Sequence, residues 1–306
     1  MKIDGREIAD EIFQDLKKRV GELEKKGLPA GRQGVIPHLA VILVGEDPAS
    51  KVYVMQKKAR GEDIDVTVDL FHYPKNVSIS DLLDKVRELN SNPQIHGIIV
   101  QRPLPEHINQ DVLEKEIIDA KDVDGFKPES PFIVPIVLAV LLILEEVFYS
   151  SSEMQSIESR SSRLANARSN NNEFLNWLKS KNIVLLGKGS TAGKPIFDYF
   201  TEIGAQPTLI DSKTENPESI TKQADIIISS VGKKDLIKPE VIKKEVILIS
   251  IGINRGADGK LHGDYDEEKI QEMASFYTPT PGGVGPVNVA MLLANLVTSA
   301  EKQNSL

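Results

Sequence analysis

The stretch that most constrains the fold is residues 37–59, PHLAVILVGEDPASKVYVMQKKA. Its apolar run over 39–44 suits a buried parallel strand, and a glycine turn follows. Asp47 then occupies the place of a helix N-cap, and Pro48 fits the first helical position, where its missing N–H costs nothing. The stretch therefore predicts a strand that leads through a tight turn into a helix, which is the building unit of an α/β sheet.

Three polar side chains share one face of that predicted helix. Ser50, Tyr53 and Lys57 are spaced i, i+3 and i+7, which places a hydroxyl, a phenol and an amine near the carboxyl end of the strand. Open α/β sheets bind their ligands at that edge. A solvated helix face with one aromatic residue at its border explains the same pattern, so the spacing alone leaves both interpretations open.

The alternation of strand and helix continues through the first half of the chain. An amphipathic helix is predicted over 7–26, and a turn-rich loop or small insertion over 27–34 separates it from the first strand. The pattern then predicts a strand over 66–73, a helix over 80–90 and a strand over 96–100. Such alternation implies a parallel sheet with right-handed crossover connections.

Two short motifs follow in this half. Gln101 leaves the end of a predicted strand in the string VQRPLP, where a polar residue before a proline loop is commonly structural. The string KDVDGF carries Asp122 and Asp124 in an acidic turn, for which metal binding is conceivable. No third acidic or histidine ligand accompanies the two aspartates, so the sequence predicts no metal site.

A second strand, turn and helix begin at Asn182, with Gly187, Gly189 and Gly193 in the turn. Small residues let the backbone approach a pyrophosphate, and a helix N-terminus supplies free N–H groups. The spacing G-x-G-x-x-x-G is not the usual dinucleotide fingerprint, so a tight turn without a ligand explains it as well. A further strand is predicted to end in the string PTLIDSKT, residues 207–214, and two more are predicted over 224–233, ending at Gly232, and over 245–255.

Composition limits the kinds of protein that the chain can be. Its 306 residues suffice for two domains, and 37 basic against 45 acidic residues, a net charge of −8, argue against binding to nucleic acid or anionic membranes. The absence of cysteine excludes disulfides and thiolate metal sites, and no signal peptide precedes the first helix, so a cytoplasmic location is expected. The apolar run over 132–147 is too short for a membrane span and predicts a buried helix, whereas 149–173, rich in Ser and Asn, predicts a flexible insertion.

Five strings in this order resemble the bifunctional methylenetetrahydrofolate dehydrogenase/cyclohydrolase family: SKVYVMQKK, VQRPLP, KDVDGF, GKGSTAGKP and TPTPGGVGPVN. The resemblance implies a two-domain α/β fold. Its folate-binding catalytic domain would comprise 1–126 and 278–306, with a parallel sheet, and its Rossmann-like NAD(P)-binding domain would comprise 127–277. The resemblance also implies tetrahydrofolate derivatives as substrates, two activities in one chain and a homodimer.

The resemblance further implies roles for individual residues of the catalytic domain. Lys57 is the expected proton carrier, because an amine carries protons well at neutral pH once its pKa falls from roughly 10.4 toward 7 or 8. Gln101 is expected beside Lys57, where an amide orients the amine without adding charge, and Asp124 is expected to bind the pterin through paired hydrogen bonds. Tyr53 is expected to stack on the substrate ring and to hydrogen-bond with Lys57. The other expected substrate-binding residues are Ser50, Pro281, Gly282 and Gly283.

The cofactor is expected at the residues that match the second-domain motifs of the family: Gly187, Lys188, Gly189, Ser190, Gly193, Ser212, Lys213, Gly232 and Ile253. Lys188, Ser212 and Lys213 can bind a 2′-phosphate and favour NADP. Asp211 favours NAD instead, because a carboxylate after the second strand commonly binds a ribose diol and repels a 2′-phosphate. NADP is the expected cofactor, and NAD is left open.

The chain departs from the family pattern in several places, and three of these departures bear on cofactor use. Gly189 replaces a serine, Ser250 replaces an aspartate, and the segment 127–135 is shortened and lacks a proline-rich motif. Two alternatives therefore stay open. One is a monofunctional NAD(P) dehydrogenase on a related two-domain fold, and the other is a folate-binding relative that has lost cofactor use.

Overall fold

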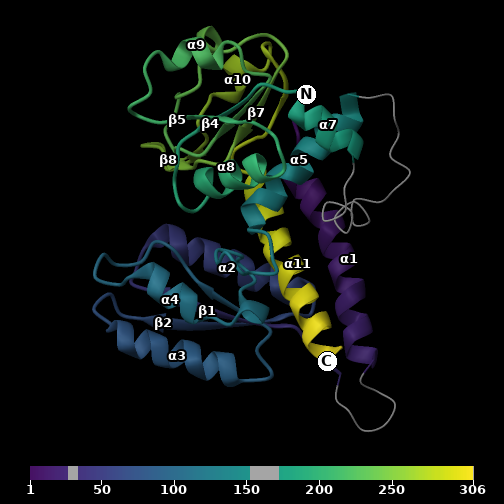
Figure 1. Ribbon diagram of the computed structural model, residues 1–306, viewed down its shortest axis with the longest axis vertical. Coiled ribbons are helices and arrows are strands. Elements are labelled where there is room, and N and C mark those ends of the chain that lie inside the picture. The colour runs from purple at the N-terminus through teal and green to yellow at the C-terminus, as the bar shows by residue number, and fades with distance from the viewer. Residues whose placement is uncertain (27–33, 152–171, 306) are drawn as a thin grey trace. The chain divides into compact units, whose positions relative to one another are not determined.

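The computed structural model describes residues 1–26, 34–151 and 172–305 (Figure 1). Two compact units divide the chain: unit 1 comprises Met1–Glu11 and Ile136–Asn288, and unit 2 comprises Ile12–Pro135 and Val289–Leu306. Each unit has a parallel sheet of its own, which confirms the predicted α/β class. The domain limits given above stay a prediction.

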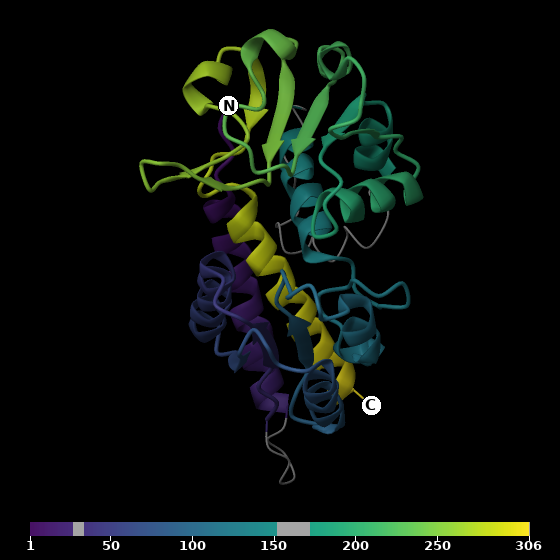
Figure 2. The ribbon, with the colours of Figure 1, turned by 90° about the vertical axis from the view of Figure 1, so that its left-hand side faces the viewer.

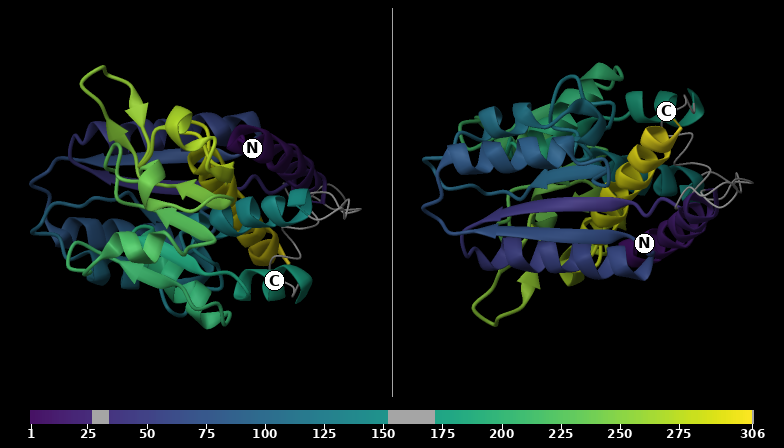
Figure 3. Two further views of the ribbon diagram at one scale, coloured as in Figure 1. Left: turned by 90° about the horizontal axis from the view of Figure 1, so that it is seen from above. Right: turned by 90° about the horizontal axis from the view of Figure 1, so that it is seen from below.

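The sheet of unit 2 consists, in the described residues, of parallel strands in the order β2-β1-β3. The right view of Figure 3 shows β1 and β2 side by side. Their bounds are His38–Val44 for β1, Thr67–Tyr73 for β2 and Gly97–Val100 for β3. β1 is the central strand and is buried from Leu39 onward, which explains its continuous apolar run.

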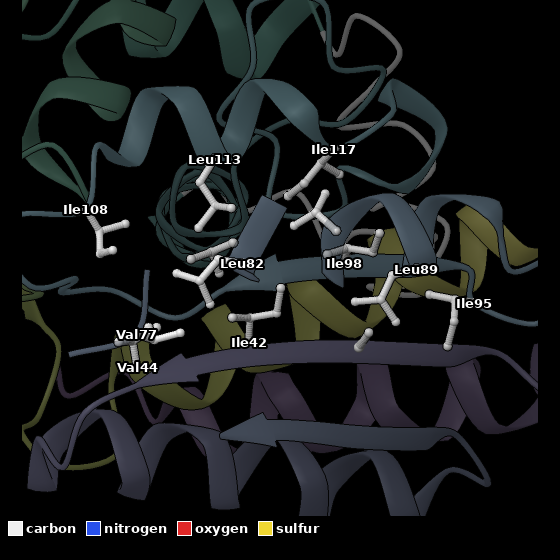
Figure 4. Packing of buried hydrophobic residues seen from close by; sticks show 13 residues of the cluster. Ile42, Val44, Val77, Leu82, Leu89, Ile95, Ile98, Ile108, Leu113 and Ile117 are labelled. Carbon is white, nitrogen blue, oxygen red and sulfur yellow. The ribbon is translucent and has the colours of Figure 1, made fainter. Parts of the chain in front are cut away.

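One apolar core of unit 2 lies between this sheet and the helices α3 (Ile79–Ser91) and α4 (Gln110–Glu116) (Figure 4). α3 begins after Ser78, whose hydroxyl accepts the N–H of Asp81 at 3.1 Å as an N-cap. Successive side chains of a strand point to opposite faces, so alternate residues of β1 enter this core. Its members include Ile42, Val44, Leu82, Leu89, Ile98 and Leu113.

A buried lysine closes the carboxyl end of α3. The Lys121 ammonium, in a residue only 3% exposed, donates to the carbonyl oxygens of Leu89, Asn90 and Asn92 at 2.9, 2.8 and 2.7 Å. These carbonyl groups lie in the last helical turn and at the C-cap Asn92, where a cation complements the negative end of the helix dipole. Burial lowers the pKa of Lys121. The lysine of the KDVDGF string is therefore a helix cap that fixes the loop leading to Asp124.

The two terminal helices, α1 (Gly5–Lys26) and α11 (Val284–Asn304), each contribute residues to unit 2. The Arg19 guanidinium pairs with the Glu301 carboxylate at 2.7 Å. The Asn295 amide donates to the carbonyl oxygens of Val123 and Ile133 at 2.9 and 3.0 Å. α11 thus holds the segment on both sides of Asp124 in place.

The sheet of unit 1 has parallel strands in the order β10-β7-β6-β4-β5 across the described residues. Figure 2 shows some of these strands as green arrows. The chain passes from β4 to β5 on one side and then returns to the other side of β4 as β6. The strand order therefore reverses between β4 and β6, which is where open α/β sheets bind ligands. The bounds are Ile183–Leu186 (β4), Thr208–Ile210 (β5), Ile226–Ser229 (β6), Val246–Ser250 (β7) and Ala274–Tyr277 (β10).

Helices accompany the strands of unit 1 in the α/β manner: α5 (Pro135–Ser151), α7 (Asn172–Lys179), α8 (Gly193–Glu202), α9 (Pro217–Thr221) and α10 (Glu267–Ile270). The helix predicted over 132–147 begins at Pro135 and continues to Ser151. Both edges of the insertion predicted over 149–173 are therefore helical, and its remainder, 152–171, lies outside the described residues, as does most of the loop predicted over 27–34. No helix in the described part of the chain is both long and apolar enough to span a membrane.

Two predicted strands are too long. The run 224–233 forms a strand only over Ile226–Ser229, because Gly232 has φ +72° and cannot continue an extended strand. The run 245–255 is wrong as a single strand: β7 ends at Ser250, and β8 (Asn254–Arg255) pairs antiparallel with β9 (Leu261–His262). Gly252 separates the two strands, and a Cβ there would lie 2.2 Å from the nitrogen of Gly232, so two backbones meet where only glycine fits.

Candidate functional site

The helix that carries the predicted catalytic residues is α2, Pro48–Asp63 in unit 2. The Asp47 carboxylate accepts the N–H of Ser50 at 2.7 Å, so the predicted N-cap is confirmed. The hydroxyl of Ser50, which is buried, donates to the carbonyl oxygen of Arg102 at 3.2 Å. The start of α2 is thus tied to the loop that follows β3.

Lys57 and Gln101 lie together. The Lys57 ammonium donates to Oε1 of Gln101 at 2.9 Å, and both residues are half-buried. The amide nitrogen of Gln101 donates to the Arg102 carbonyl at 2.9 Å, and its backbone N–H donates to the Ile42 carbonyl at 2.8 Å. These bonds orient the amide so that its oxygen, rather than its NH₂ group, faces the amine.

Asp124 belongs to the same electrostatic group. Burial lowers the pKa of Lys57, and the Asp124 carboxylate opposes this by raising it. Burial raises the pKa of Asp124, and the positive charges of Lys57 and then Arg102 lower it. The three side chains of Lys57, Gln101 and Asp124 therefore form a site in which an amine is held below its ordinary pKa beside an acidic anchor.

Tyr53 is half-buried on the same helix, and burial raises the pKa of its phenol, which keeps the group neutral. In the described residues the hydrogen bond of the Lys57 ammonium goes to Gln101 and not to Tyr53. The stacking of Tyr53 on a substrate ring and its bond to Lys57 stay predictions for the folate complex.

Three residues that the sequence reasoning missed pack together next to this site: Arg102, Glu114 and Phe126. The Arg102 guanidinium makes a forked ion pair with the Glu114 carboxylate, with N···O distances of 2.7 Å from one nitrogen to each oxygen. It also lies over the ring of Phe126, 3.6 Å from the centroid, two residues beyond Asp124. Burial raises the pKa of Glu114 and the bonds from Arg102 oppose this. The arginine inside the string VQRPLP was the available signal, but nothing in the sequence indicated its partners.

The predicted glycine turn lies between β4 and α8 of unit 1. Gly187 has φ +92°, and a Cβ on Gly193 would lie 1.9 Å from the Gly187 carbonyl oxygen, so both positions require glycine. Gly189 faces open space and has no such requirement. α8 begins here without a side-chain cap. The N–H of Lys194 already donates to the Gly189 carbonyl at 3.0 Å and Pro195 has no N–H, so the helix start offers an anion the N–H of Gly193 and the positive end of the dipole. Ser190 is exposed on the same turn.

At the end of β5 a carboxylate pairs with the predicted phosphate-binding lysine. The Lys188 ammonium lies 2.5 Å from Oδ2 of Asp211, and Oδ1 of Asp211 accepts the N–H of Lys213 at 2.8 Å. The hydrogen bond from Lys188 is the main reason why the pKa of Asp211 is lowered. Ser212 and Lys213 have exposed side chains beside it.

On the other side of the strand reversal lie Gly232 and Ile253, of which Ile253 is 38% exposed. The nearby Ser250, which replaces a family aspartate, accepts the N–H of Asp264 on its hydroxyl at 3.0 Å. Its own N–H donates to the hydroxyl of Thr278 at 2.9 Å. Ser250 therefore fastens the end of β7 to two later segments, which gives its hydroxyl a structural role.

The string TPTPGGVGPVN, residues 278–288, belongs to unit 1. The other predicted substrate-binding and catalytic residues belong to unit 2: Ser50, Tyr53, Lys57, Gln101 and Asp124. Gly282 has φ +107°, and a Cβ on Gly283 would lie 2.5 Å from the Pro279 carbonyl oxygen. Pro281, which precedes Gly282, is exposed. At the end of the string, Oδ1 of Asn288 is the one buried side-chain polar atom in the described residues that has no hydrogen-bond partner. Such an atom is costly to bury and marks Asn288 as a further candidate for ligand binding.

Two family profiles match this chain. The profile for the tetrahydrofolate dehydrogenase/cyclohydrolase catalytic domain covers residues 3–124, and the profile for the NAD(P)-binding domain of the same family covers residues 172–304. The chain belongs to the tetrahydrofolate dehydrogenase/cyclohydrolase family. The resemblance of the five strings is thereby confirmed.

Individual members of the tetrahydrofolate dehydrogenase/cyclohydrolase family are similar over nearly the whole length. The bifunctional protein FolD of Bacillus subtilis is 37% identical over 300 residues, which is 98% of this chain and 97% of that protein. The bifunctional FolD enzyme of Campylobacter jejuni has a crystal structure that matches with a TM-score of 0.84 and 33% identity over 100% of this chain and 99% of that one. The enzyme of Trypanosoma brucei, solved with NADP and an inhibitor, matches with a TM-score of 0.83 and 27% identity over the same shares.

We predict that Arg102→Met destabilises unit 2 by about 3 kcal/mol, because it leaves the Glu114 carboxylate without its cation in a site where the two side chains are only 10% and 15% exposed. Chemical denaturation of the wild type and the variant measures this free energy of unfolding. Adding Glu114→Met to Arg102→Met should recover part of the loss, since no unpaired charge then remains.

Arg87→Met is the matched control, because Arg87 is 56% exposed and its partners Asp84 and Glu116 are 69% and 33% exposed. It should leave the free energy of unfolding nearly unchanged, since solvent screens such surface pairs. Equal losses for the two arginines would contradict a stabilising role for the pair beneath Asp124.

Proposed function

We propose that this chain oxidises 5,10-methylenetetrahydrofolate to the 5,10-methenyl form with NADP and then hydrolyses the methenyl form to 10-formyltetrahydrofolate. The observation that carries the proposal is the Lys57 ammonium, held 2.9 Å from Gln101 and electrostatically coupled to Asp124, in a chain of this family. A half-buried amine beside an amide and a carboxylate is suited to moving a proton at a bound substrate.

In the hydrolysis, water adds to the methenyl carbon and must lose a proton. Burial lowers the pKa of Lys57, so its ammonium loses its proton more readily than that of an ordinary lysine and the free amine is easier to form. Gln101 keeps the amine in position, because its oxygen accepts from Lys57 while its NH₂ group is held by the Arg102 carbonyl. Asp124 supplies acceptor oxygens that match the amino-pyrimidinone edge of a pterin.

For the oxidation, a bound nicotinamide cofactor would supply the acceptor for the hydride of the one-carbon bridge. The glycine turn would hold its pyrophosphate, because Gly187 and Gly193 allow a tight backbone turn that leads directly into α8, whose dipole and Gly193 N–H favour an anion. Gly232 and Ile253 would border the other half of the cofactor across the reversal of strand order. The task of the protein in this step is to orient the cofactor and to exclude water.

The preference for NADP is supported by the cationic and hydroxyl groups of Lys188, Ser212 and Lys213 at the ends of β4 and β5. Asp211 weakens this preference, since it pairs with Lys188 and a 2′-phosphate must compete with it for the ammonium. The relative from Trypanosoma brucei was solved in complex with NADP as its cofactor. We therefore propose NADP as the better cofactor, with less discrimination against NAD than a site without Asp211 would have.

No observation favours the two alternatives left open by the sequence. Loss of cofactor use would be expected if Gly189 or Ser250 damaged the nucleotide site, but Gly189 faces open space and Ser250 makes ordered hydrogen bonds. A cytoplasmic location, a homodimer and the absence of nucleic-acid binding stay predictions, supported by the lack of cysteine, by the family and by the net charge of −8.

We expect the wild-type protein to form the methenyl compound from 5,10-methylenetetrahydrofolate and NADP, and to hydrolyse added methenyl compound, both followed by absorbance. Lys57→Met should lower the hydrolysis rate by at least about a hundredfold, because it removes the proton carrier, and should leave NADP affinity unchanged. Absence of methenyl formation by the wild type with either NADP or NAD would contradict the proposed oxidation.

Lys58→Met is the control for this variant, because Lys58 is an exposed neighbour on α2. It should hydrolyse the methenyl compound at the wild-type rate. Hydrolysis by Lys57→Met at the rate of Lys58→Met would reject Lys57 as the proton carrier.

We expect Asp211→Asn to raise the ratio of kcat/KM for NADP to kcat/KM for NAD by about tenfold, because it frees Lys188 and removes a negative charge that repels the 2′-phosphate. Steady-state kinetics with each cofactor measure the ratio. Glu215→Gln removes an exposed charge from the same loop and should leave the ratio unchanged. A ratio in Asp211→Asn equal to that of the control would show that Asp211 takes no part in cofactor choice.

A further inference from the structure

A fully buried carboxylate lies beneath the β6 loop, which we define as residues 230–233. Asp264 has 0% exposure, and no ion pair with it occurs in the part of the chain that the structure describes. A buried carboxylate without a cation is stable only if hydrogen bonds satisfy it. The hydrogen-bond partners of the Asp264 carboxylate therefore show which segment it holds in place.

The partners of the Asp264 carboxylate all come from the end of β6 and from the β6 loop. Oδ2 of Asp264 accepts the Ser229 hydroxyl at 2.7 Å and the N–H of Val231 at 3.3 Å. Oδ1 accepts the N–H of Lys233 at 2.7 Å. One carboxylate thus fixes two backbone N–H groups that stand on either side of Gly232, whose φ is +72°. The two carboxylate oxygens therefore hold the backbone of the loop on both sides of this glycine.

The β6 loop forms one wall of the place where the strand order reverses. Ser230 and Val231 lie against the glycine turn, since a Cβ on Gly187 would lie 3.1 Å from the Ser230 hydroxyl and 3.1 Å from a methyl group of Val231. The Ser230 hydroxyl also donates to the Leu186 carbonyl at 3.2 Å. Two loops that follow neighbouring strands, β4 and β6, are therefore fitted to each other at the ligand-binding edge of the sheet.

We propose that Asp264 is a positioning residue that fixes the β6 loop against the nicotinamide half of the cofactor. The inference rests on the proposed function, in which the β4 turn and the end of β5 hold the pyrophosphate and the adenosine ribose. The remaining half of a dinucleotide then extends across the strand reversal toward β6. Asp264 touches none of the reacting atoms, and its effect passes through the backbone of Val231 and Lys233.

Asp264→Asn tests this with little change of shape. An amide keeps one acceptor oxygen, but its NH₂ group must face either the N–H of Lys233 or the donors at Oδ2, so one side of the loop is released. We expect NADP to bind at least tenfold more weakly and dehydrogenase turnover to fall, while adenosine 2′,5′-bisphosphate, which lacks the nicotinamide half, binds within twofold of its wild-type affinity. Isothermal titration calorimetry measures both affinities, and hydrolysis of the methenyl compound should stay within twofold of the wild-type rate.

Asp266→Asn is the matched control from the same turn, because the Asp266 carboxylate caps α10 through the N–H of Glu268 and does not contact the β6 loop. It should leave both affinities unchanged. Parallel losses of NADP and adenosine 2′,5′-bisphosphate in Asp264→Asn, or unchanged binding of both, would overturn the proposal.

Ser229→Ala decides the matter if Asp264→Asn does not fold, because it removes one donor and leaves the carboxylate and both backbone bonds in place. We expect NADP affinity to fall two- to fivefold in this variant with no change for adenosine 2′,5′-bisphosphate, and equal behaviour of the two ligands would overturn the proposal. A wild-type protein that binds neither ligand would instead contradict the proposed function.

Discussion

The central constraint on this protein is the placement of one amine, Lys57, in a half-buried position with a single fixed acceptor. The amide of Gln101 holds it at 2.9 Å, and the backbone of Arg102 in turn holds that amide. Asp124 provides an opposite charge near enough to counteract part of the effect of burial. Because β1 and β3 are adjacent parallel strands, α2 and the Gln101 loop leave the sheet at the same edge, so the fold itself brings these groups together.

Much of this arrangement could be predicted from the sequence. The apolar run of β1, the cap at Asp47 and the glycine turn at Gly187 are local signals, and each gave the right element in the right place. The adjacency of Lys57 and Gln101 followed from strand order and from family resemblance, since the two residues are 44 positions apart. Periodicity finds strands and helices, and parallel topology then decides which of their ends meet.

The parts that could not be predicted depend on contacts between segments that are distant in the sequence. The sequence reasoning gave Arg102 no role, yet Arg102 pairs with Glu114 and stacks on Phe126. Asp264 lies in the string GDYDEE, which resembles a family turn, but the sequence gave this residue no role, because a buried carboxylate bound to backbone N–H groups has no sequence pattern of its own. The prediction of one strand over 245–255 was wrong for a similar reason. The backbone of Gly232, which is distant in the sequence, packs against Gly252 so closely that a Cβ there would not fit. The partners of these side chains therefore depend on residues that are distant in the sequence, whereas the positions of most strands and helices follow from local sequence patterns.

The most direct test of this account is the pKa of the Lys57 amine in the wild-type protein, followed by NMR of its side-chain nitrogen as the pH is raised. Burial and Asp124 act in opposite directions on this pKa, and the account requires burial to dominate. It predicts that Lys57 loses its proton below the ordinary lysine value of 10.5. Titration at or above that value would mean that Lys57 is an ordinary solvated or ion-paired lysine, and would contradict the assignment of the site.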